Sequence, residues 1–292
     1  MSSKTFTVVV MALTALIVFL FVSAPPPLPE QAMPNANIPV ATALRLVEAE
    51  NDVVRGLWTK EIVGAGQQAG LEFNEDWREA DEQAGPLPAL FLRETARNLE
   101  RDPVRLSLFL GSDSPINPAN GFEGLQEEYF KQIRETGEPQ FFLMSDTGLY
   151  TAMFPDEALV EGCVSCHNDH EDTPKTDWQL HDVMGATTWA YPNAMLTGNE
   201  ALELLVALRT AFRGTYEAYL NKVAEFDNPP QIGARWPAEG YYLPSTDVFM
   251  TEVRRRTAEA SLETLLKAAS LSASEPDSAA GTGLDVAGEQ PE

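Results

Sequence analysis

The sequence predicts an α+β fold, because strand patterns and helix patterns occupy separate parts of the chain. Alternating apolar and polar residues predict strands between positions 103 and 191, amphipathic stretches predict two long helices after position 196, and an apolar run opens the chain. The 292 residues can form one substantial domain with a smaller helical appendage. We predict five parts: a membrane anchor or signal (1–24), a Pro-rich tether (25–39), the main α+β domain (40–195), a helical extension (196–269) and a disordered acidic tail (270–292).

The N-terminal run, residues 8–24, is apolar or small and follows a single charged side chain, Lys4. Its length lies near the lower limit for spanning a bilayer. Residues 22–24 resemble the cleavage site of a signal peptide, but Pro25 would follow the cut directly, so we favour an uncleaved anchor. Both alternatives export the rest of the chain, and Lys4 stays in the cytoplasm. The sequence thus predicts a single-pass anchor in the cytoplasmic (inner) membrane, with the bulk of the chain periplasmic.

Local patterns predict several helices and strands within the main domain. Residues 41–63 read as a helix whose apolar stripe is imperfect, running through Leu44, Val47, Val54, Leu57 and Val63. The elements that follow are a strand at 103–111, a turn at 117–122, a helix at 124–136, a strand pair at 140–144 and 148–153, and a strand at 183–191. Residues 155–160 predict a turn and a short helix.

The chain has two cysteines, and they lie in the segment Cys163-Val164-Ser165-Cys166-His167. A thiol–disulfide redox pair would use the same spacing, usually at a helix start after a strand, and residues 155–160 predict no such strand. A zinc site would need two further ligands. His170 and His181 are available, but their spacing matches structural zinc sites poorly.

Covalent haem attachment accounts for both cysteines and the histidine together. With two residues between them, Cys163 and Cys166 lie about one helical turn apart, so both sulfurs can reach the two vinyl groups of one porphyrin. His167 follows at once and brings an imidazole under the iron as the proximal ligand. Thioethers form outside the cytoplasm, where the export segment places the motif. One motif predicts one haem c.

The main domain also resembles a known family: extracytoplasmic single-haem c-type proteins with a PAS-like fold, found alone or as the sensor half of membrane receptors. The resemblance spans roughly residues 40–192 and implies a curved antiparallel sheet with flanking helices that holds the haem against it. Trp178 is a candidate for packing on the porphyrin. The residues that carry the resemblance are Asn117-Pro118-x-Asn120, Glu127, Tyr150 to Pro155, the cysteine motif, Trp178-x-x-x-Asp182-Val183-Met184-Gly185-Ala186, and Tyr191-Pro192.

The second axial ligand of the iron is left open by the sequence. Members of such a family can supply it from the helix before the sheet, cysteine being one option, but this chain has no third cysteine and no His or Met between positions 34 and 144. His181, beside the strand at 183–191, is the leading candidate distal ligand. An open iron is the alternative. The weaker candidates are His170, which reads as a solvated loop residue, and Met144, Met153 and Met184, which read as gap-filling core residues.

After the main domain the pattern becomes helical. Residues 199–226 form a long amphipathic helix that ends at 227–230, and Ser245 or Thr246 caps a second helical stretch. We predict a helical hairpin packed on the haem domain or on a partner.

Charge and composition restrict the partners. The chain carries 44 acidic and 20 basic residues, a net charge of −24, which argues against nucleic acid and anionic lipid as partners because both attract basic patches. Solubility explains this excess; an acidic docking face for a basic electron-transfer partner is the alternative.

Two functions follow from one haem. Two strong axial ligands suit one-electron transfer, alone or as a subunit of a larger complex, whereas an open site suits a haem-based redox or gas sensor that acts through a separate signalling partner. Either way the protein partner lies in or at the membrane. We favour electron transfer and expect no enzyme, because three histidines, one of them on iron, form no convincing catalytic site.

Overall fold

The structure is a computed structural model that describes Thr5, residues 13–14 and residues 38–274, the side chains of 268–274 excepted. Most of the predicted anchor (1–24), most of the tether, and the predicted tail from residue 275 onward lie outside the described residues. Within the described ranges, no helix combines the length and hydropathy of a membrane span. The described residues 38–274 belong to one compact unit.

A four-stranded antiparallel sheet lies at the centre of this unit, in the order β4-β7-β6-β5. The longest ladder joins β6 to β7 and pairs Tyr150 with Tyr191 and Phe154 with Thr187. The sheet and its flanking helices confirm the α+β prediction. The strands are β4 (Ser107–Gly111), β5 (Gln140–Leu143), β6 (Tyr150–Glu157) and β7 (Val183–Tyr191).

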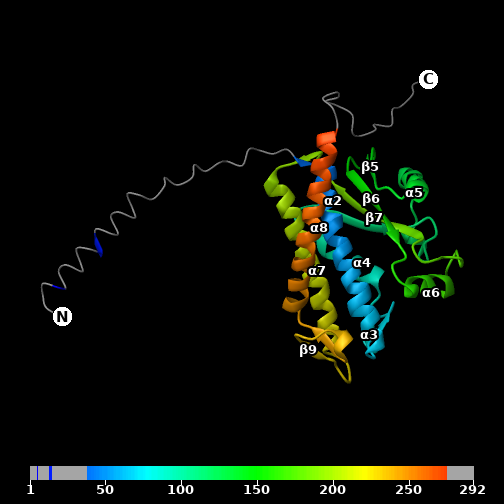
Figure 1. Cartoon of the computed structure of the whole chain (residues 1–292). Coiled ribbons are helices and arrows are strands. Elements are labelled where there is room, and N and C mark those ends of the chain that lie inside the picture. The colour runs from blue at the N-terminus through cyan, green and yellow to red at the C-terminus, as the bar shows by residue number, and fades with distance from the viewer. Residues whose placement is uncertain (1–4, 6–12, 15–37, 275–292) are drawn as a thin grey trace. The chain divides into compact units, whose positions relative to one another are not determined.

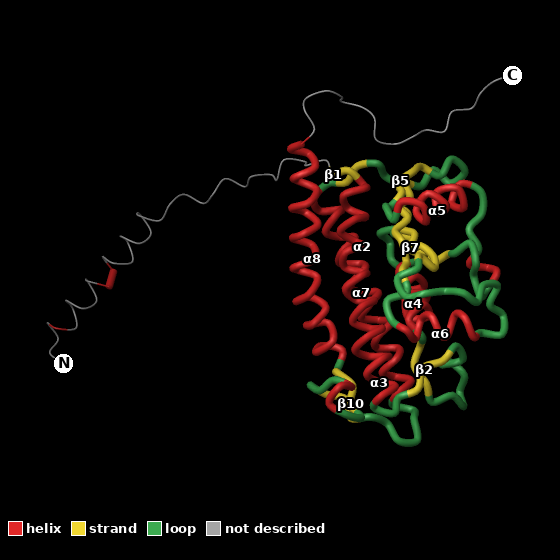
Figure 2. The backbone as a smooth tube through the Cα atoms, turned by 45° about the vertical axis from the view of Figure 1, so that its right-hand side comes forward, coloured by secondary structure: helices red, strands yellow, loops and turns green. Residues whose placement is uncertain are grey.

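Both faces of the sheet are covered by helices (Figures 1 and 2). Successive residues of a strand point to opposite faces, so Ala152 and Trp189 join the larger core while Met153 and Ala186 join a smaller one. The smaller core is closed by α5 (Leu125–Thr136), whose Phe130 is fully buried. The helices of the larger core are α2 (Val40–Leu57) with its π-helical continuation η1 (Trp58–Gly64), α4 (Pro88–Leu99), α7 (Gly198–Val223) and α8 (Thr246–Ser274).

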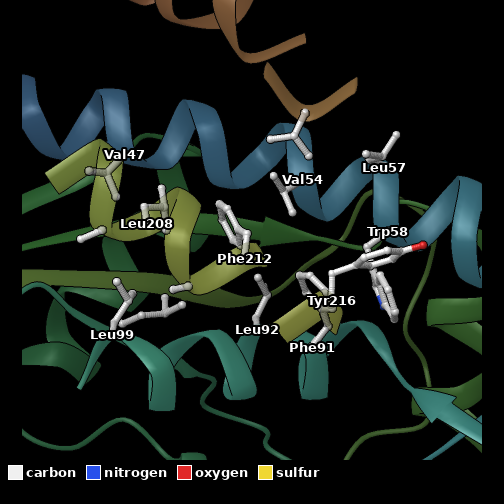
Figure 3. Packing of buried hydrophobic residues seen from close by; sticks show 14 of the residues in the cluster. Val47, Val54, Leu57, Trp58, Phe91, Leu92, Leu99, Leu208, Phe212 and Tyr216 are labelled. Carbon is white, nitrogen blue, oxygen red and sulfur yellow. The ribbon is translucent and has the colours of Figure 1, made fainter. Parts of the chain in front are cut away.

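Aromatic side chains join η1, α4, α7 and α8 in the larger core, and Figure 3 shows Trp58, Phe91 and Tyr216 among them. Trp58 stacks on Phe91 with 4.3 Å between ring centroids, and Tyr216 stacks on Phe249 at 4.1 Å. The hydroxyl of Tyr216 donates to the carbonyl of Pro244 at 2.7 Å, so this buried polar group is satisfied. The two C-terminal helices, α7 and α8, therefore pack within the chain itself, in the larger core on one face of the sheet.

The remaining elements are short. They comprise α3 (Ala65–Gln68), α6 (Glu161–Asp169), the 3₁₀ turns Pro118–Asn120 and Pro237–Glu239, and the strand pairs β1 (Ile38–Pro39) with β8 (Met195–Leu196), β2 (Glu72–Asn74) with β3 (Ala84–Pro86), and β9 (Gln231–Gly233) with β10 (Tyr242–Pro244). Residues 38–39, expected in the tether, thus form a strand. Residues 270–274, expected in the disordered tail, continue α8.

A capping box starts α7. The hydroxyl of Thr197 accepts from the backbone N–H of Glu200 at 3.2 Å, and the Glu200 carboxylate accepts from the N–H of Thr197 at 2.7 Å. Replacing Thr197 by alanine leaves helix N–H groups unsatisfied and should lower the free energy of unfolding by about 1 kcal/mol in denaturant titrations. Thr210→Ala, an exposed change in the same helix, is the control and should have a smaller effect. Equal losses in the two variants would contradict a specific role for the cap.

Residues 155–157 differ from their prediction. They were expected in a turn, but Pro155 pairs with Ala186 and Asp156 with Gly185, so β6 runs on to Glu157. Pro155 is tolerated because β5 begins at Gln140, opposite Met153, so one side of β6 is not paired by β5 beyond Met153. A strand therefore leads directly into the cysteine motif.

Candidate functional site

The cysteine motif lies on α6, at the end of the sheet where β6 ends and β7 begins (Figure 1). The approach to α6 is fixed by buried Ala158, whose N–H donates to the carbonyl of Asp182 at 3.0 Å and whose carbonyl accepts from His181 at 3.1 Å. These two bonds hold the chain before α6 against the chain before β7. The helix is therefore anchored to the two central strands.

The far end of α6 is held by Trp178. The Asn168 side chain donates to the carbonyl of Trp178 at 3.0 Å and accepts from its N–H at 2.9 Å. The indole is 5% exposed, its Nε1–H has no hydrogen-bond partner among the described residues, and the Lys175 ammonium lies 4.3 Å from its ring centroid. The predicted haem-contact residue thus lies beside the motif with a free donor and a cation next to it.

Both cysteines are free thiols one turn apart on α6; Cys163 is half-buried and Cys166 is exposed. Partial burial, and then the charge of Glu75, raise the pKa of the Cys166 thiol. Thiol–disulfide enzymes instead lower the pKa of a cysteine to obtain a thiolate. A strand does precede α6, contrary to the prediction, so the local structure does not exclude a redox thiol pair, but the raised pKa of the Cys166 thiol argues against one. The cysteines and histidines considered as zinc ligands form no metal-holding cluster of three or more within the described ranges.

His167 is half-buried, and burial lowers the pKa of its imidazole, which favours the neutral form that binds metals. His170 ends the helix. Its Nδ1 accepts from the N–H of Asp172 at 3.1 Å, and its Nε2 lies 3.5 Å from the Glu75 carboxylate. His170 lies in the loop just past α6, as expected, but its side chain is only 20% exposed, so it is a partly buried loop histidine. Because His170 follows His167 by three residues, the two share a side of the helix, which makes His170 a poor ligand for the opposite face of a porphyrin.

A cavity of about 430 Å³ opens beside His170. Asn117 and Pro118, from the segment that carries the family resemblance, also line this cavity, together with Glu75, Ile116 and Asp172. The Asn117 side chain accepts from the N–H of Ala119 at 3.0 Å, which shapes this turn. The size lies within the range of cofactor pockets.

His181 is exposed and adopts a left-handed backbone with φ of 70°. Such a conformation is uncommon outside glycine and marks the residue as constrained. The contacts of the structure do not bring its side chain to His167, so its role as distal ligand stays a prediction. Met153 is fully buried in the smaller core, Met144 packs against the same core, and Met184 is half-buried at the start of β7.

A charged cluster on α2 faces the same end of the sheet. Arg55, 8% exposed, donates from Nη2 to the Asp156 carboxylate and, at 3.2 Å, to the carbonyl of Glu157. Asp156, Asp52, Glu48 and then Cys163 act on the guanidinium and raise the pKa of Arg55 despite its burial. Arg55 thus joins the helix before the sheet to the end of β6 and to the cysteine motif.

Two carboxyl groups extend this cluster into the core. Glu48 is 4% exposed; its Oε2 accepts from Trp189 Nε1 and from Asn51 at 3.3 Å, and its Oε1 has no partner among the described residues. Burial, and then the charge of Asp52, raise the pKa of Glu48 well above its ordinary value. Asp52, one turn on, reaches the surface but is crowded by protein, and this desolvation raises the pKa of Asp52 to about 6.

These shifts predict a pH dependence of stability. A raised carboxyl pKa means that the folded state binds more protons than the unfolded state between the two pKa values, so the free energy of unfolding falls as pH rises through that window. Asp52→Asn removes the Asp52 contribution. The variant should gain stability relative to wild type between about pH 4 and pH 6 in urea titrations, whereas exposed Asp81→Asn should not. Parallel curves for all three proteins would contradict the assignment.

The residues present fit a covalently attached haem. Two accessible thiols one turn apart would hold the porphyrin, His167 would bind the iron, and the unpartnered indole N–H of Trp178 with Lys175 beside it could meet a propionate. A bound haem would supply one-electron redox chemistry at its iron.

The sequence did not single out the cluster of Glu48, Asp52, Arg55 and Asp156. A signal was present: polar side chains at 48, 52 and 55 recur at helical spacing and interrupt the apolar stripe of residues 41–63, and those at 48 and 55 are buried.

Comparison with known proteins adds a family. No curated protein and no solved structure shows significant similarity to the chain. The family model described as Tll0287-like matches residues 33–192, just over half of the chain, and this range includes the whole sheet, α6 and the cluster on α2. The chain therefore belongs to the Tll0287-like family, a family of cytochrome c-like domains.

Proposed function

We propose that this protein binds one haem c, attached through Cys163 and Cys166 with His167 as the proximal iron ligand, and that it transfers single electrons. The observation that carries the proposal is the placement of both free thiols and His167 on one short helix that is anchored to the two central strands of a domain of this family. The antiparallel sheet with helices on both faces supports the PAS-like part of the sequence prediction.

The setting of the protein belongs to the same proposal. An N-terminal anchor at residues 1–24 would hold the domain on the periplasmic side of the cytoplasmic membrane. A redox protein in or at that membrane would be its partner, and the domain could be a subunit of a larger complex. The proposal includes no enzymatic activity.

The alternative is a haem-based redox or gas sensor with a separate signalling partner. What favours this alternative is that α2 offers no evident distal ligand for the iron. Its ionisable side chains at this end of the sheet are Glu48, Asp52 and Arg55, and a buried arginine paired with Asp156 is no iron ligand. If His181 does not reach the iron, the sixth position stays open to a small gas.

Optical spectra of the reduced, haem-loaded full chain separate the two functions. We expect a six-coordinate spectrum that carbon monoxide leaves unchanged, and we expect His181→Ala to make it sensitive to carbon monoxide. His170→Ala is the matched control and should leave the spectrum as in wild type. A wild-type spectrum that shifts at once with carbon monoxide would support the sensor instead, and an unchanged H181A spectrum would exclude His181 as ligand.

A further inference from the structure

The side of α2 that faces the sheet carries more acid than base. Glu48, Asp52 and Arg55 are spaced one turn apart, and β6 adds Asp156 and Glu157 at the same place. Trp189 from β7 adds an N–H donor to Glu48. Among the described residues that act on these carboxyls, Arg55 is the one cation.

Helices on the other side of α2 do not neutralise this acid. Arg209 of α7 pairs with Glu50 at 2.7 Å, and Arg256 of α8 pairs with Glu61 at 2.6 Å and with Glu252. These arginines are therefore held by other carboxylates.

Arg55 itself is engaged by Asp156 and by the carbonyl of Glu157. Glu48 and Asp52 therefore share this one cation with Asp156, so the like charges of the two carboxyls, one turn apart, are only partly compensated and still repel each other. Such a pair binds a proton readily, and a further negative charge nearby increases its proton affinity. Arg55, which acts on both carboxyls, also lies within electrostatic reach of Cys163, so it links the pair to the site on α6.

We propose that Glu48 and Asp52 bind one proton from solvent when the site on α6 is reduced by one electron, so that this protein couples electron transfer to proton uptake. The inference rests on the proposed haem function. With a haem bound, a one-electron donor would supply the electron, and one carboxylate of the pair would become a carboxyl group with a proton taken from water. Oxidation by the next carrier returns the proton, and no covalent bond to carbon changes in either direction.

The geometry supplies a route for the proton. Asp52 reaches the surface, whereas Glu48 is buried. Asp52 therefore exchanges protons with solvent, and protonation of Glu48 changes the charge inside the protein. The raised pKa of Asp52, about 6, places the start of the response near neutral pH. Neither carboxyl touches the cysteines or His167 in the described contacts.

Potentiometric titration of the haem-loaded full chain at several pH values tests the proposal. The reduction potential should fall as pH rises above about 6, with a limiting slope of one tenfold change in the reduction equilibrium constant per pH unit, about 59 mV. Glu48→Gln, which keeps an acceptor for Trp189, and Asp52→Asn should each flatten the slope. Glu128→Gln on the exposed face of α5 is the matched control and should keep it. A flat wild-type curve, or a wild-type slope retained in both pair variants, overturns the proposal.

An infrared difference spectrum of reduced minus oxidised wild-type protein gives a second test that does not depend on variants. It should gain the carbonyl stretch of a protonated carboxyl, shifted in heavy water and absent in E48Q or D52N; no such band in wild type overturns the proposal. The mass of the purified chain shows beforehand whether haem is attached. A chain without haem would contradict the proposed function, whereas a haem-loaded chain whose reduction potential does not change with pH would contradict only this inference.

Discussion

Replacing both Cys163 and Cys166 by serine should abolish covalent haem in protein exported together with a cytochrome c maturation system. Serine keeps the size and polarity of these partly exposed side chains but cannot form a thioether, so α6 should persist without its attachment points. Intact mass after denaturation should show the haem increment for wild type and none for the double variant.

Ser165→Ala is the matched control. Ser165 lies between the cysteines, is exposed, and donates only to the carbonyl of Glu161 at 3.1 Å. This variant should carry haem as wild type does. Covalent haem in the double serine variant would place the attachment elsewhere and contradict the assignment of the motif.

Replacing Arg55 by leucine should cause the second large effect, a loss of about 3–5 kcal/mol in the free energy of unfolding at neutral pH. The guanidinium is the cation shared by Asp156, Asp52 and Glu48, and the variant leaves these carboxyls partly buried and uncompensated. Urea titrations measure the loss, which should shrink in acid as the carboxyls become protonated.

Arg134→Leu is the control for this prediction. Arg134 pairs with Asp113, but its side chain is 48% exposed, so removing it should cost less than about 1 kcal/mol. Similar losses for R55L and R134L would show that the Arg55 cluster behaves as an ordinary surface ion pair.

The sequence predicts those elements whose side-chain period is clear. The alternating segment 103–111 contains β4, the predicted strand at 183–191 becomes β7, and the helix patterns at 124–136 and 199–226 become α5 and α7. The segment 88–99 has a helix-start proline and an apolar face, yet its helix, α4, was not predicted. The extension of β6 to Glu157 was missed because pairing with β7 overrides the local turn preference of Pro155-Asp156.

Of the candidate site, the sequence predicts the cysteine motif and the residues close to it along the chain, but not its long-range partners. Cys163, Cys166, His167 and Trp178 do lie together, because α6 is short and Asn168 ties Trp178 to it. Long-range partners leave no local signal: Glu75 lies far from His170 in sequence, and α2 meets β6 across the sheet. Charge at positions 48, 52 and 55 signals a buried cluster only when the partner strand is known.

Intact mass of the denatured wild-type chain, exported with the cytochrome c maturation machinery, tests the central claim most directly. The account predicts one haem per chain that survives denaturation and maps to the peptide containing Cys163 and Cys166. A chain of unmodified mass, with both thiols free to react, would contradict it.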